Sequence, residues 1–584
     1  MTSMKNIPWL LRKIFSYNKG YLIFSICLAA LMGVLPFVTM INTQIIMNTI
    51  QTGVEGQAQS IAINIAMFVG IGLLLEVITG VGAHVRGVYN EYLAYEVNSE
   101  VMAQTALFDL KDYEDAETYN LIQRAENEAG VRPYKVLMSV ISLITVVMKL
   151  STSVFILVSW QWWTVFVIIA FPVFSSLGFF KITKNEYQVE MNRTSKLRKT
   201  WYISHLLTKD SFVKEVKMFG LSNYLIELFK AERLGFFAEN RNLSKKRSTF
   251  TSLYGIGNFL TSSGLIIFAI FQAMGGVILL GSLMLYLRTI KMVEEGVKGL
   301  ISLCFSLYKD AMFLDALRTL LSHKPSDYGQ PKLVIDSIRS IELKNVSYSY
   351  QGKAALQNIS LMFHQGDKVA IVGHNGSGKT TLVKLLTGIY TDYTGEIRIN
   401  GRDLKTIDTT SLRAQFAVLF QDFNKYEFSV ADNIGLGKLD KLTEQSAIER
   451  AAVASGADGF INDLVGGYQQ QLGTWFEGGV QLSGGQWQKL ALSRAFMRDA
   501  SVYVLDEPTS ALDPMAEFEL FERFSQATQE KIGLFITHRF MNAHFANRIV
   551  VLDGGQVVED GRHEQLLAND GYYKRLYNLQ LGIA

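Results

Sequence analysis

Long uncharged runs dominate the first half of the chain. Residues 20–54 and 253–287 each extend over 35 positions without an acidic or basic residue. Three further segments, 61–85, 136–160 and 162–180, contain at most one Asp, Glu, Lys or Arg each. Because about 20 apolar residues cross a bilayer, these patterns predict six membrane spans, with the second long run divided near Gly275 and Gly276. The predicted spans cover residues 21–45, 61–85, 136–158, 162–180, 253–274 and 283–305.

The basic residues predict the orientation of these spans. Segment 181–252 contains fifteen Lys and Arg against seven Asp and Glu, whereas the candidate outer loops 47–60, 159–161 and 275–282 contain no Lys or Arg. Basic loops stay on the cytoplasmic side. We therefore predict a multi-pass cell-membrane protein, in contact with membrane lipid, whose N-terminus and C-terminal half are cytoplasmic. Helical periodicity in segments 86–134 and 181–252 predicts membrane helices that continue into the cytoplasm and turn near 110–122 and 208–219.

The pattern changes after residue 321. Segment 322–337 is rich in Pro and Gly and predicts a linker. From residue 338 to 584, short β-like runs alternate with helical stretches, which predicts an α/β domain after a membrane domain over 1–321. A net charge of +3 gives little support to a nucleic-acid partner, and two cysteines exclude a disulfide scaffold.

A glycine-rich loop in the α/β domain predicts a phosphate site. The loop fits the pattern G-x-x-x-x-G-K-[ST], follows an apolar strand at 369–372 and precedes a helix that starts near Thr381. Backbone N–H groups of such a loop face phosphates, the Lys reaches the β- and γ-phosphates, and the hydroxyl ligates Mg²⁺. The residues are Gly373, His374, Asn375, Gly376, Ser377, Gly378, Lys379 and Thr380.

A second strand, 502–505, ends in two carboxylates, Asp506 and Glu507. In this position Asp506 can hold Mg²⁺ through water, and Glu507 can polarise an attacking water as a general base. An acid pair after an apolar strand is a weak signal alone. Together with the glycine-rich loop it predicts nucleotide hydrolysis.

With the sequence LSGGQ at 482–486, the chain resembles the ATP-binding cassette transporters over nearly its whole length. The resemblance implies ATP and Mg²⁺ as cofactors. It implies that Tyr350 stacks on adenine, with Tyr348 as the less favoured candidate, and that Thr381 belongs to the nucleotide site. It also implies that Gln421 links Mg²⁺ to the membrane domain, that 510–513 form the D-loop, and that His538 contacts the γ-phosphate.

One cassette after one six-span unit resembles a half-transporter of the type I exporter kind. In that family two chains enclose two ATP molecules, each between the Lys379 loop of one chain and the LSGGQ segment of the other. The residues implied in the second role are Ser483, Gly484, Gly485 and Gln486. Because every motif is intact, we expect a homodimer with two competent sites.

Other segments resemble the nisin-type lantibiotic exporters that lack a peptidase domain. They include YEDAETYN at 113–120, LGTWFEGG at 472–479 and QLSGGQWQK at 481–489. The resemblance implies export of a modified precursor peptide with its leader, and it raises peptide-modifying enzymes as partners. A multidrug or lipid exporter of the same fold, and a non-transporting ATPase, stay open as alternatives.

The sixth predicted span carries a charged stripe. Five charged residues fall within an arc of roughly 120° at 100° per residue: Arg288, Lys291, Glu294, Glu295 and Lys298. Charges at membrane depth should face a water-filled cavity, so we predict that Arg288, Lys291, Glu295 and Lys298 line the cargo cavity and that a mixed-sign wall suits a polar peptide. The alternative is a span that starts later, with the stripe on a cytoplasmic helix face. The lone charges Glu76 and Lys149 could pair with each other or with this stripe.

Overall fold

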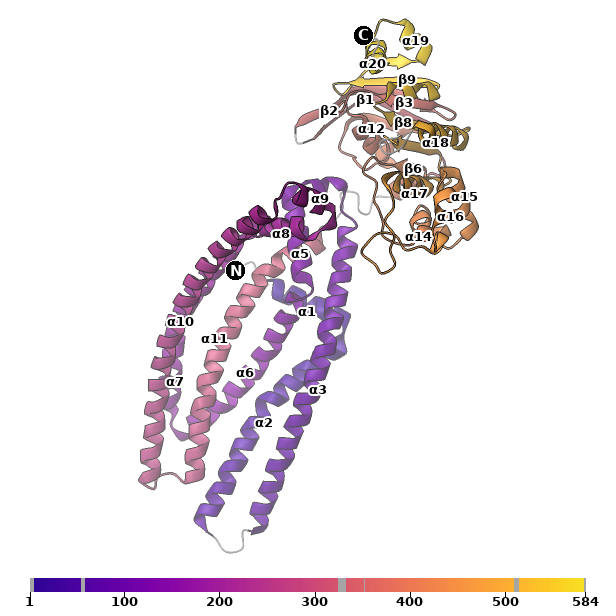
Figure 1. The fold of residues 1–584 in the computed structure, drawn as a ribbon. Coiled ribbons are helices and arrows are strands. Elements are labelled where there is room, and N and C mark those ends of the chain that lie inside the picture. The colour runs from indigo at the N-terminus through magenta and orange to yellow at the C-terminus, as the bar shows by residue number, and fades with distance from the viewer. Residues whose placement is uncertain (1–4, 54–57, 324–331, 351, 509–513, 582–584) are drawn as a thin grey trace. The chain divides into compact units, whose positions relative to one another are not determined.

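The computed structural model describes residues 5–53, 58–323, 332–350, 352–508 and 514–581 (Figure 1). The chain divides into two compact units. The helical unit comprises Met1–Phe108 and Asp115–Lys324, and the α/β unit comprises Asp109–Glu114 and Pro325–Ala584. Half of the predicted linker 322–337, residues 324–331, lies outside the described residues.

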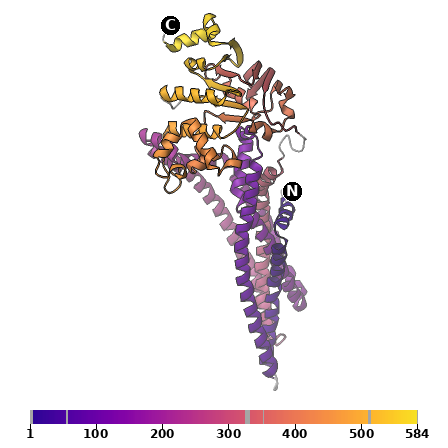
Figure 2. The ribbon, with the colours of Figure 1, turned by 90° about the vertical axis from the view of Figure 1, so that its right-hand side faces the viewer.

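The helical unit is built from long helices that run alongside one another in both ribbon views (Figures 1 and 2). The helix α3 has 48 residues, which at 1.5 Å per residue is about 72 Å. This length is more than twice the hydrocarbon thickness of a bilayer, about 30 Å, so the predicted continuation beyond the membrane is confirmed. The helices are α1 (Asn6–Tyr17), α2 (Lys19–Thr52), α3 (Ala58–Thr105), α5 (Ala116–Ala129), α6 (Arg132–Trp160), α7 (Trp162–Asn192), α8 (Thr194–Thr208), α9 (Asp210–Met218), α10 (Ser222–Met274) and α11 (Leu280–Ser322).

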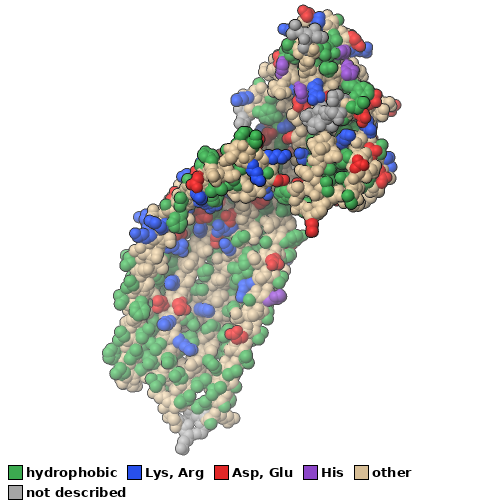
Figure 3. Space-filling view, in the orientation of Figure 1, with side chains coloured by type: hydrophobic (Ala, Val, Ile, Leu, Met, Phe, Trp, Pro, Cys, Tyr) green, Lys and Arg blue, Asp and Glu red, His purple; other side chains and the backbone are tan. Residues whose placement is uncertain are grey.

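Among the described residues, five helices are long and apolar enough to cross a membrane: α2, α3, α6, α7 and α10. Large apolar side chains on them are exposed, such as Leu73 at 63% and Phe174 at 78%. Figure 3 shows hydrophobic side chains gathered on the part of the helical unit distant from α9, with scattered charges among them. An exposed apolar surface of this extent fits lipid contact. The sixth predicted span lies in α11, outside this set of five, and stays a prediction.

Helix α11 is fixed in the helical unit by both its outer end and one apolar face. Gly281 lets α11 approach α2 closely, because a Cβ there would lie 2.5 Å from Gln44 O and from Asn48 Oδ1. The side-chain amides of Gln44 and Asn48 donate to Ser282 Oγ at 2.9 and 3.2 Å. Further along α11, three buried residues pack in an apolar cluster with side chains of α6, α7 and α10: Ile290, Val293 and Val297.

The α/β unit contains two sheets. The antiparallel sheet has the order β2-β1-β4-β5, and the larger sheet has the order β10-β9-β3-β8-β7-β6, parallel except for its edge strand β10. The strands predicted at 369–372 and 502–505 are confirmed as β3 and β7. The strands are β1 (Ser340–Tyr350), β2 (Lys353–His364), β3 (Lys368–Val372), β4 (Thr394–Ile399), β5 (Arg402–Asp403), β6 (Phe416–Leu419), β7 (Val502–Asp506), β8 (Ile532–Thr537), β9 (Arg548–Asp553) and β10 (Gln556–Gly561).

Two apolar cores cover the larger sheet, and a third cluster forms a separate helical part of the unit. One core packs the inner side of the antiparallel sheet and α12 against the larger sheet, and the other lies under α17 and α18. The helical part is centred on the buried Trp487. The helices are α12 (Lys379–Leu386), α13 (Thr409–Ala414), α14 (Val430–Gly435), α15 (Gln445–Ser455), α16 (Asp458–Asp463), α17 (Gly484–Phe496), α18 (Pro514–Ala527), α19 (His563–Ala568) and α20 (Tyr572–Leu581).

The short helix α4 (Leu110–Glu114) belongs to the α/β unit. Tyr390 donates its hydroxyl hydrogen bond to Glu114 Oε1 at 2.7 Å, and Lys111 pairs with Asp392. The first turn region predicted from the sequence therefore includes a helix that packs on the α/β unit.

Candidate nucleotide-binding site and cargo cavity

The order of the larger sheet brings the predicted nucleotide residues to one edge. Neighbouring strands β3, β8, β7 and β6 are parallel, so their carboxyl ends meet there. The glycine-rich loop follows β3, His538 follows β8, and Asp506 ends β7. Gln421 comes two residues after β6. Four segments far apart in the sequence thus converge because of the strand order.

The side chain of Lys379, the first residue of α12, folds back onto the glycine-rich loop. Its side chain is 6% exposed, and Nζ donates to the carbonyl oxygens of Gly373 and His374 at 3.0 and 2.9 Å. Burial lowers the pKa of Lys379. A phosphate at this loop would supply the negative charge that favours the ammonium form. The three loop residues before Ser377 are exposed and accessible to such a ligand: His374, Asn375 and Gly376.

Gly378 is required by the path of the loop. Its φ is +100°, and a Cβ would lie 2.6 Å from Leu356 Cδ2 and 2.7 Å from Ala355 O. An L side chain would be strained and would also collide with backbone. The loop therefore enters α12 with the free N–H groups and positive potential of a helix N-terminus.

Asp506 and Thr380 form a pair that fits a divalent cation. Asp506 is 1% exposed, and its Oδ2 accepts a hydrogen bond from Thr380 Oγ1 at 2.9 Å. Its Oδ1 is buried without a partner among the described residues. Burial raises the pKa of Asp506 to about 6, so a cation at the free oxygen would stabilise the charged form. The described residues contain no group of three His, Cys, Asp or Glu that could hold a metal. Mg²⁺ would therefore need phosphate oxygens as further ligands.

Glu507 lies between Gln421 and His538, two further residues of the predicted site. Gln421 Nε2 donates to Glu507 Oε2 at 2.7 Å, and His538 Nδ1 lies 3.5 Å from Oε1. The backbone of Glu507 has φ +48°, a left-handed conformation that costs about 1–3 kcal/mol outside glycine. The strain places the carboxylate at the carboxyl edge beside Asp506, where it can hold and polarise a water.

The structure distinguishes the two candidate adenine-stacking tyrosines. Tyr348 is 4% exposed and stacks on Tyr390 with ring centroids 5.0 Å apart. Tyr350 is only half-buried, contacts both rings edge to face, and has its hydroxyl 3.5 Å from Thr381 Oγ1. Only Tyr350 of these two keeps an accessible surface for a base, so the geometry favours Tyr350.

The LSGGQ segment begins α17 in the helical part of the α/β unit. Ser483 is the N-cap: its Oγ accepts from Gln486 N at 3.3 Å, while Gln486 Oε1 accepts from Ser483 N at 2.9 Å. Ser483 and Gly484 are exposed, so the start of this helix can meet an anion from outside the unit. Gln486 is committed to the cap through its side-chain oxygen. The predicted D-loop, 510–513, lies outside the described residues.

Sequence reasoning missed a contact that holds the His538 loop. Gln580 in α20 donates through Nε2 to His538 O at 2.6 Å and accepts at Oε1 from Phe540 N at 2.7 Å. On the other side, Glu517 of α18 pairs with Arg539 at 2.6 Å. No motif marks a glutamine 42 residues after the histidine it supports, so only the fold reveals it.

The charged stripe of α11 lines two cavities rather than one. Arg288, Lys291 and Glu295 line a cavity of about 540 Å³ between α2, α3, α6 and α11. Lys149 of α6 lines the same cavity but forms no ion pair with the stripe or with Glu76 among the described residues, and Glu76 is exposed and lies outside this lining. Lys298 lines a second cavity of about 430 Å³ between α7, α10 and α11.

Comparisons with known proteins agree with this architecture. Residues 356–510 match the family described as "ABC transporter". The chain is 35% identical to the subtilin transport ATP-binding protein SpaT of Bacillus subtilis, over 98% of this chain and 94% of that protein. It is 32% identical to the nisin transport ATP-binding protein NisT of Lactococcus lactis subsp. lactis, over 98% and 96%.

One further similarity covers part of the chain, and another concerns the fold alone. An ATP-dependent lipid A-core flippase of Desulfotalea psychrophila is 33% identical over 62% of this chain and 63% of the flippase. A structure titled as a bacterial Atm1-family ABC exporter with ATP bound aligns with a TM-score of 0.80 at 21% identity, covering 97% of this chain and 99% of that one.

Proposed function

This chain belongs to the ATP-binding cassette transporter family and has the exporter fold, and on that premise we propose that its cargo is a lantibiotic-type modified precursor peptide. The general activity follows from the family. This chain is a multi-pass membrane protein whose cytoplasmic ATP-binding domain hydrolyses ATP to drive export. The peptide assignment and the homodimer are the finer statements that need testing.

The observation that carries the peptide assignment is the extent of the similarity. SpaT and NisT, named for transport of subtilin and nisin, match over 98% of this chain, including the whole membrane domain. The similar lipid A-core flippases match over 41–62% of it. Cargo selection belongs to the membrane domain, so similarity that extends through this domain favours a peptide over a lipid.

The nucleotide site supports ATP hydrolysis by a pair of chains. Lys379 would bind the phosphates, Thr380 and Asp506 would hold Mg²⁺ with Gln421, and Glu507 would take the proton of the attacking water. His538 would contact the γ-phosphate and Tyr350 the adenine. Bound Mg²⁺ would neutralise charge on the phosphates. The exposed Ser483 and Gly484 at the start of α17 are placed to serve a nucleotide held by a second copy.

Transport into inside-out vesicles tests this function. Vesicles containing the protein should accumulate a precursor peptide with its leader only when ATP is present, and the Glu507→Gln variant should abolish accumulation because hydrolysis is lost. A matched assay should follow the flipping of fluorescent lipid A in the same vesicles. ATP-dependent lipid flipping without peptide uptake would replace the peptide proposal with the lipid alternative.

A further inference from the structure

The cavity between α2, α3, α6 and α11 carries more positive than negative charge. Its charged lining consists of Lys149, Arg288, Lys291 and Glu295. In the part of the chain that the structure describes, none of these four side chains forms an ion pair or a hydrogen bond with another residue. Three cations and a single carboxylate therefore face the same space without internal compensation.

These charges lie near the middle of the membrane when α11 is the sixth span. Helix α11 begins at Leu280, so Arg288 to Glu295 lie about 12–23 Å along its axis at 1.5 Å per residue. Lys149 lies about 17 Å from the end of α6 at Trp160 on the same scale. The hydrocarbon layer is about 30 Å thick. Unpaired charge at this depth is costly unless water or a ligand meets it.

The fold prevents the charged face of α11 from turning away. Arg288, Lys291 and Glu295 follow a spacing of three and four residues, which places them on one face. Ile290, Val293 and Val297 on the other side are buried in the apolar cluster with α6, α7 and α10. The same face continues to Lys298 and Lys309, which line the second cavity; there Lys309 pairs with Glu190 at 2.8 Å and Arg247 with Glu186 at 3.3 Å.

Resting on the proposed function, we infer that the first cavity binds a carboxylate-bearing segment of the peptide cargo. Lys149, Arg288 and Lys291 would donate hydrogen bonds to Asp or Glu side chains of the cargo. Glu295 would repel a further anion of high charge density. Within the first cavity the charged face of α11 extends from Arg288 to Glu295, about 10 Å at 1.5 Å per residue. An extended peptide covers this length with about three residues.

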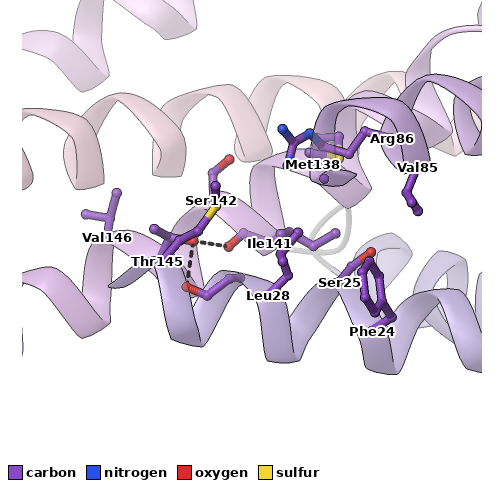
Figure 4. Close-up of a pocket in the computed structure, with 13 residues that line it drawn as sticks. Phe24, Ser25, Leu28, Val85, Arg86, Met138, Ile141, Ser142, Thr145 and Val146 are labelled. Carbon is purple, nitrogen blue, oxygen red and sulfur yellow. Dashed lines mark hydrogen bonds between the residues drawn. The ribbon is translucent and has the colours of Figure 1, made fainter. Parts of the chain in front are cut away.

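A neighbouring cavity offers a matched control. It has a volume of about 370 Å³ and shares Val146 with the cationic cavity. Its lining is mainly apolar, with hydroxyls of Ser25, Ser142 and Thr145, and Arg86 as its charged residue (Figure 4). Replacing Arg86 removes one cation from the same group of helices without touching the proposed carboxylate site.

Binding of three designed peptides to the full-length protein tests the inference. The peptides share one 20-residue sequence except at four positions, which are all Asp, all Asn or all Lys. The protein is held in nanodiscs of neutral phosphatidylcholine without nucleotide, and binding is measured by fluorescence anisotropy. We expect the Asp peptide to bind at least about 10-fold more tightly than the Asn peptide, the gain typical of a charge-assisted hydrogen bond. The Lys peptide should bind most weakly.

Variants move this preference in both directions. The double variant Arg288→Gln with Lys291→Gln should reduce the Asp-to-Asn preference below about twofold, and Arg86→Gln should leave it unchanged. Glu295→Gln should increase the preference, an effect that a misfolded protein would not produce. A decrease with Glu295→Gln, or an unchanged preference in the double variant, would overturn the inference.

The outcomes also separate this inference from the proposed function. Equal binding of all three peptides would overturn the carboxylate site and leave peptide export in place. Absence of binding by every peptide, together with ATPase stimulation by lipid A that depends on Arg288 and Lys291, would overturn both.

Discussion

Glu507 provides the sharpest test of the nucleotide site, because its replacement by Gln changes charge and little else. Glu507→Gln keeps the size of the side chain and the left-handed backbone at φ +48°. An amide oxygen can still accept the hydrogen bond that Gln421 Nε2 now gives at 2.7 Å. What is lost is the ability to take a proton from water. We therefore expect ATP turnover to fall by about 10²- to 10⁴-fold, the contribution of a general base.

The same geometry predicts that removal of the side chain stabilises the fold. A non-glycine residue in the left-handed region costs about 1–2 kcal/mol, and a glycine adds back about 0.4–1 kcal/mol through the entropy of the unfolded chain. Glu507→Gly should therefore be between neutral and about 1.6 kcal/mol more stable, which is at most roughly 3–6 °C in the melting temperature of a unit of this size. Glu507→Gln should leave the melting temperature unchanged.

Phosphate release, equilibrium ATP binding and thermal unfolding in the same detergent measure these quantities. Wild-type protein and both variants should bind ATP with similar affinity, and both variants should hydrolyse it at the background rate. Turnover of Glu507→Gln within about tenfold of wild type would remove Glu507 from the role of base. A lower melting temperature for Glu507→Gly would show that the relieved strain is smaller than the entropy gained by the unfolded chain and the lost hydrogen bond from Gln421 together.

Four other substitutions, with Leu579→Ala as a control, test the rest of the site. Ser483→Arg and Lys379→Ala should each abolish turnover. Mixing the two variant chains should restore about a quarter to a half of the wild-type activity per heterodimer if one complete site suffices. Heterodimers without activity would count against the two-chain site. Gln580→Ala should lower kcat about 3- to 30-fold with little change in KM for ATP, because it frees the loop that carries His538. Leu579→Ala, at the exposed neighbouring residue, should change neither constant. A raised KM with unchanged kcat would contradict a positioning role for Gln580. Gly378→Ala should weaken ATP binding by more than about 10-fold, since its Cβ would meet Ala355 O at 2.7 Å; isothermal titration with normal affinity would show that the loop can rearrange.

The nucleotide site could be predicted in detail because its chemistry fixes residue types at short spacings. The glycine-rich loop and Glu507 each directly follow a buried strand, Asp506 ends one, and the carboxyl ends of parallel strands meet at one edge. The contacts that support the site could not be predicted in this way. Gln580 reaches His538 from a helix 42 residues away, and its role depends on how α20 packs. The four-residue strand β6 was too short to give a pattern.

In the membrane domain, the sequence predicted the long helices but not the cavities that the charged residues line. Hydropathy indicated five helices that the structure also presents as long and apolar, but the charges of α11 keep it out of that set. Periodicity placed Arg288, Lys291, Glu295 and Lys298 on one face. It could not indicate that Lys298 lines a different cavity, nor that Lys149 joins the first one. Both facts depend on which helices stand opposite α11, and that is decided by packing contacts such as the approach of Gly281 to α2.

The two sites differ in what their charges require, and this difference explains how they can work together. Lys379 and Asp506 have hydrogen-bond partners inside their own unit, although burial still disfavours the charged form of each. Lys149, Arg288 and Lys291 have no such partners among the described residues. A conformation that exposes these cations to water is favoured over one that closes the cavity around them while it is empty. On the inference above, a ligand carboxylate would remove that penalty, and closure would then become accessible to the free energy of ATP binding. Closure of the membrane domain would therefore depend on the presence of cargo, because the charge in the empty cavity is uncompensated.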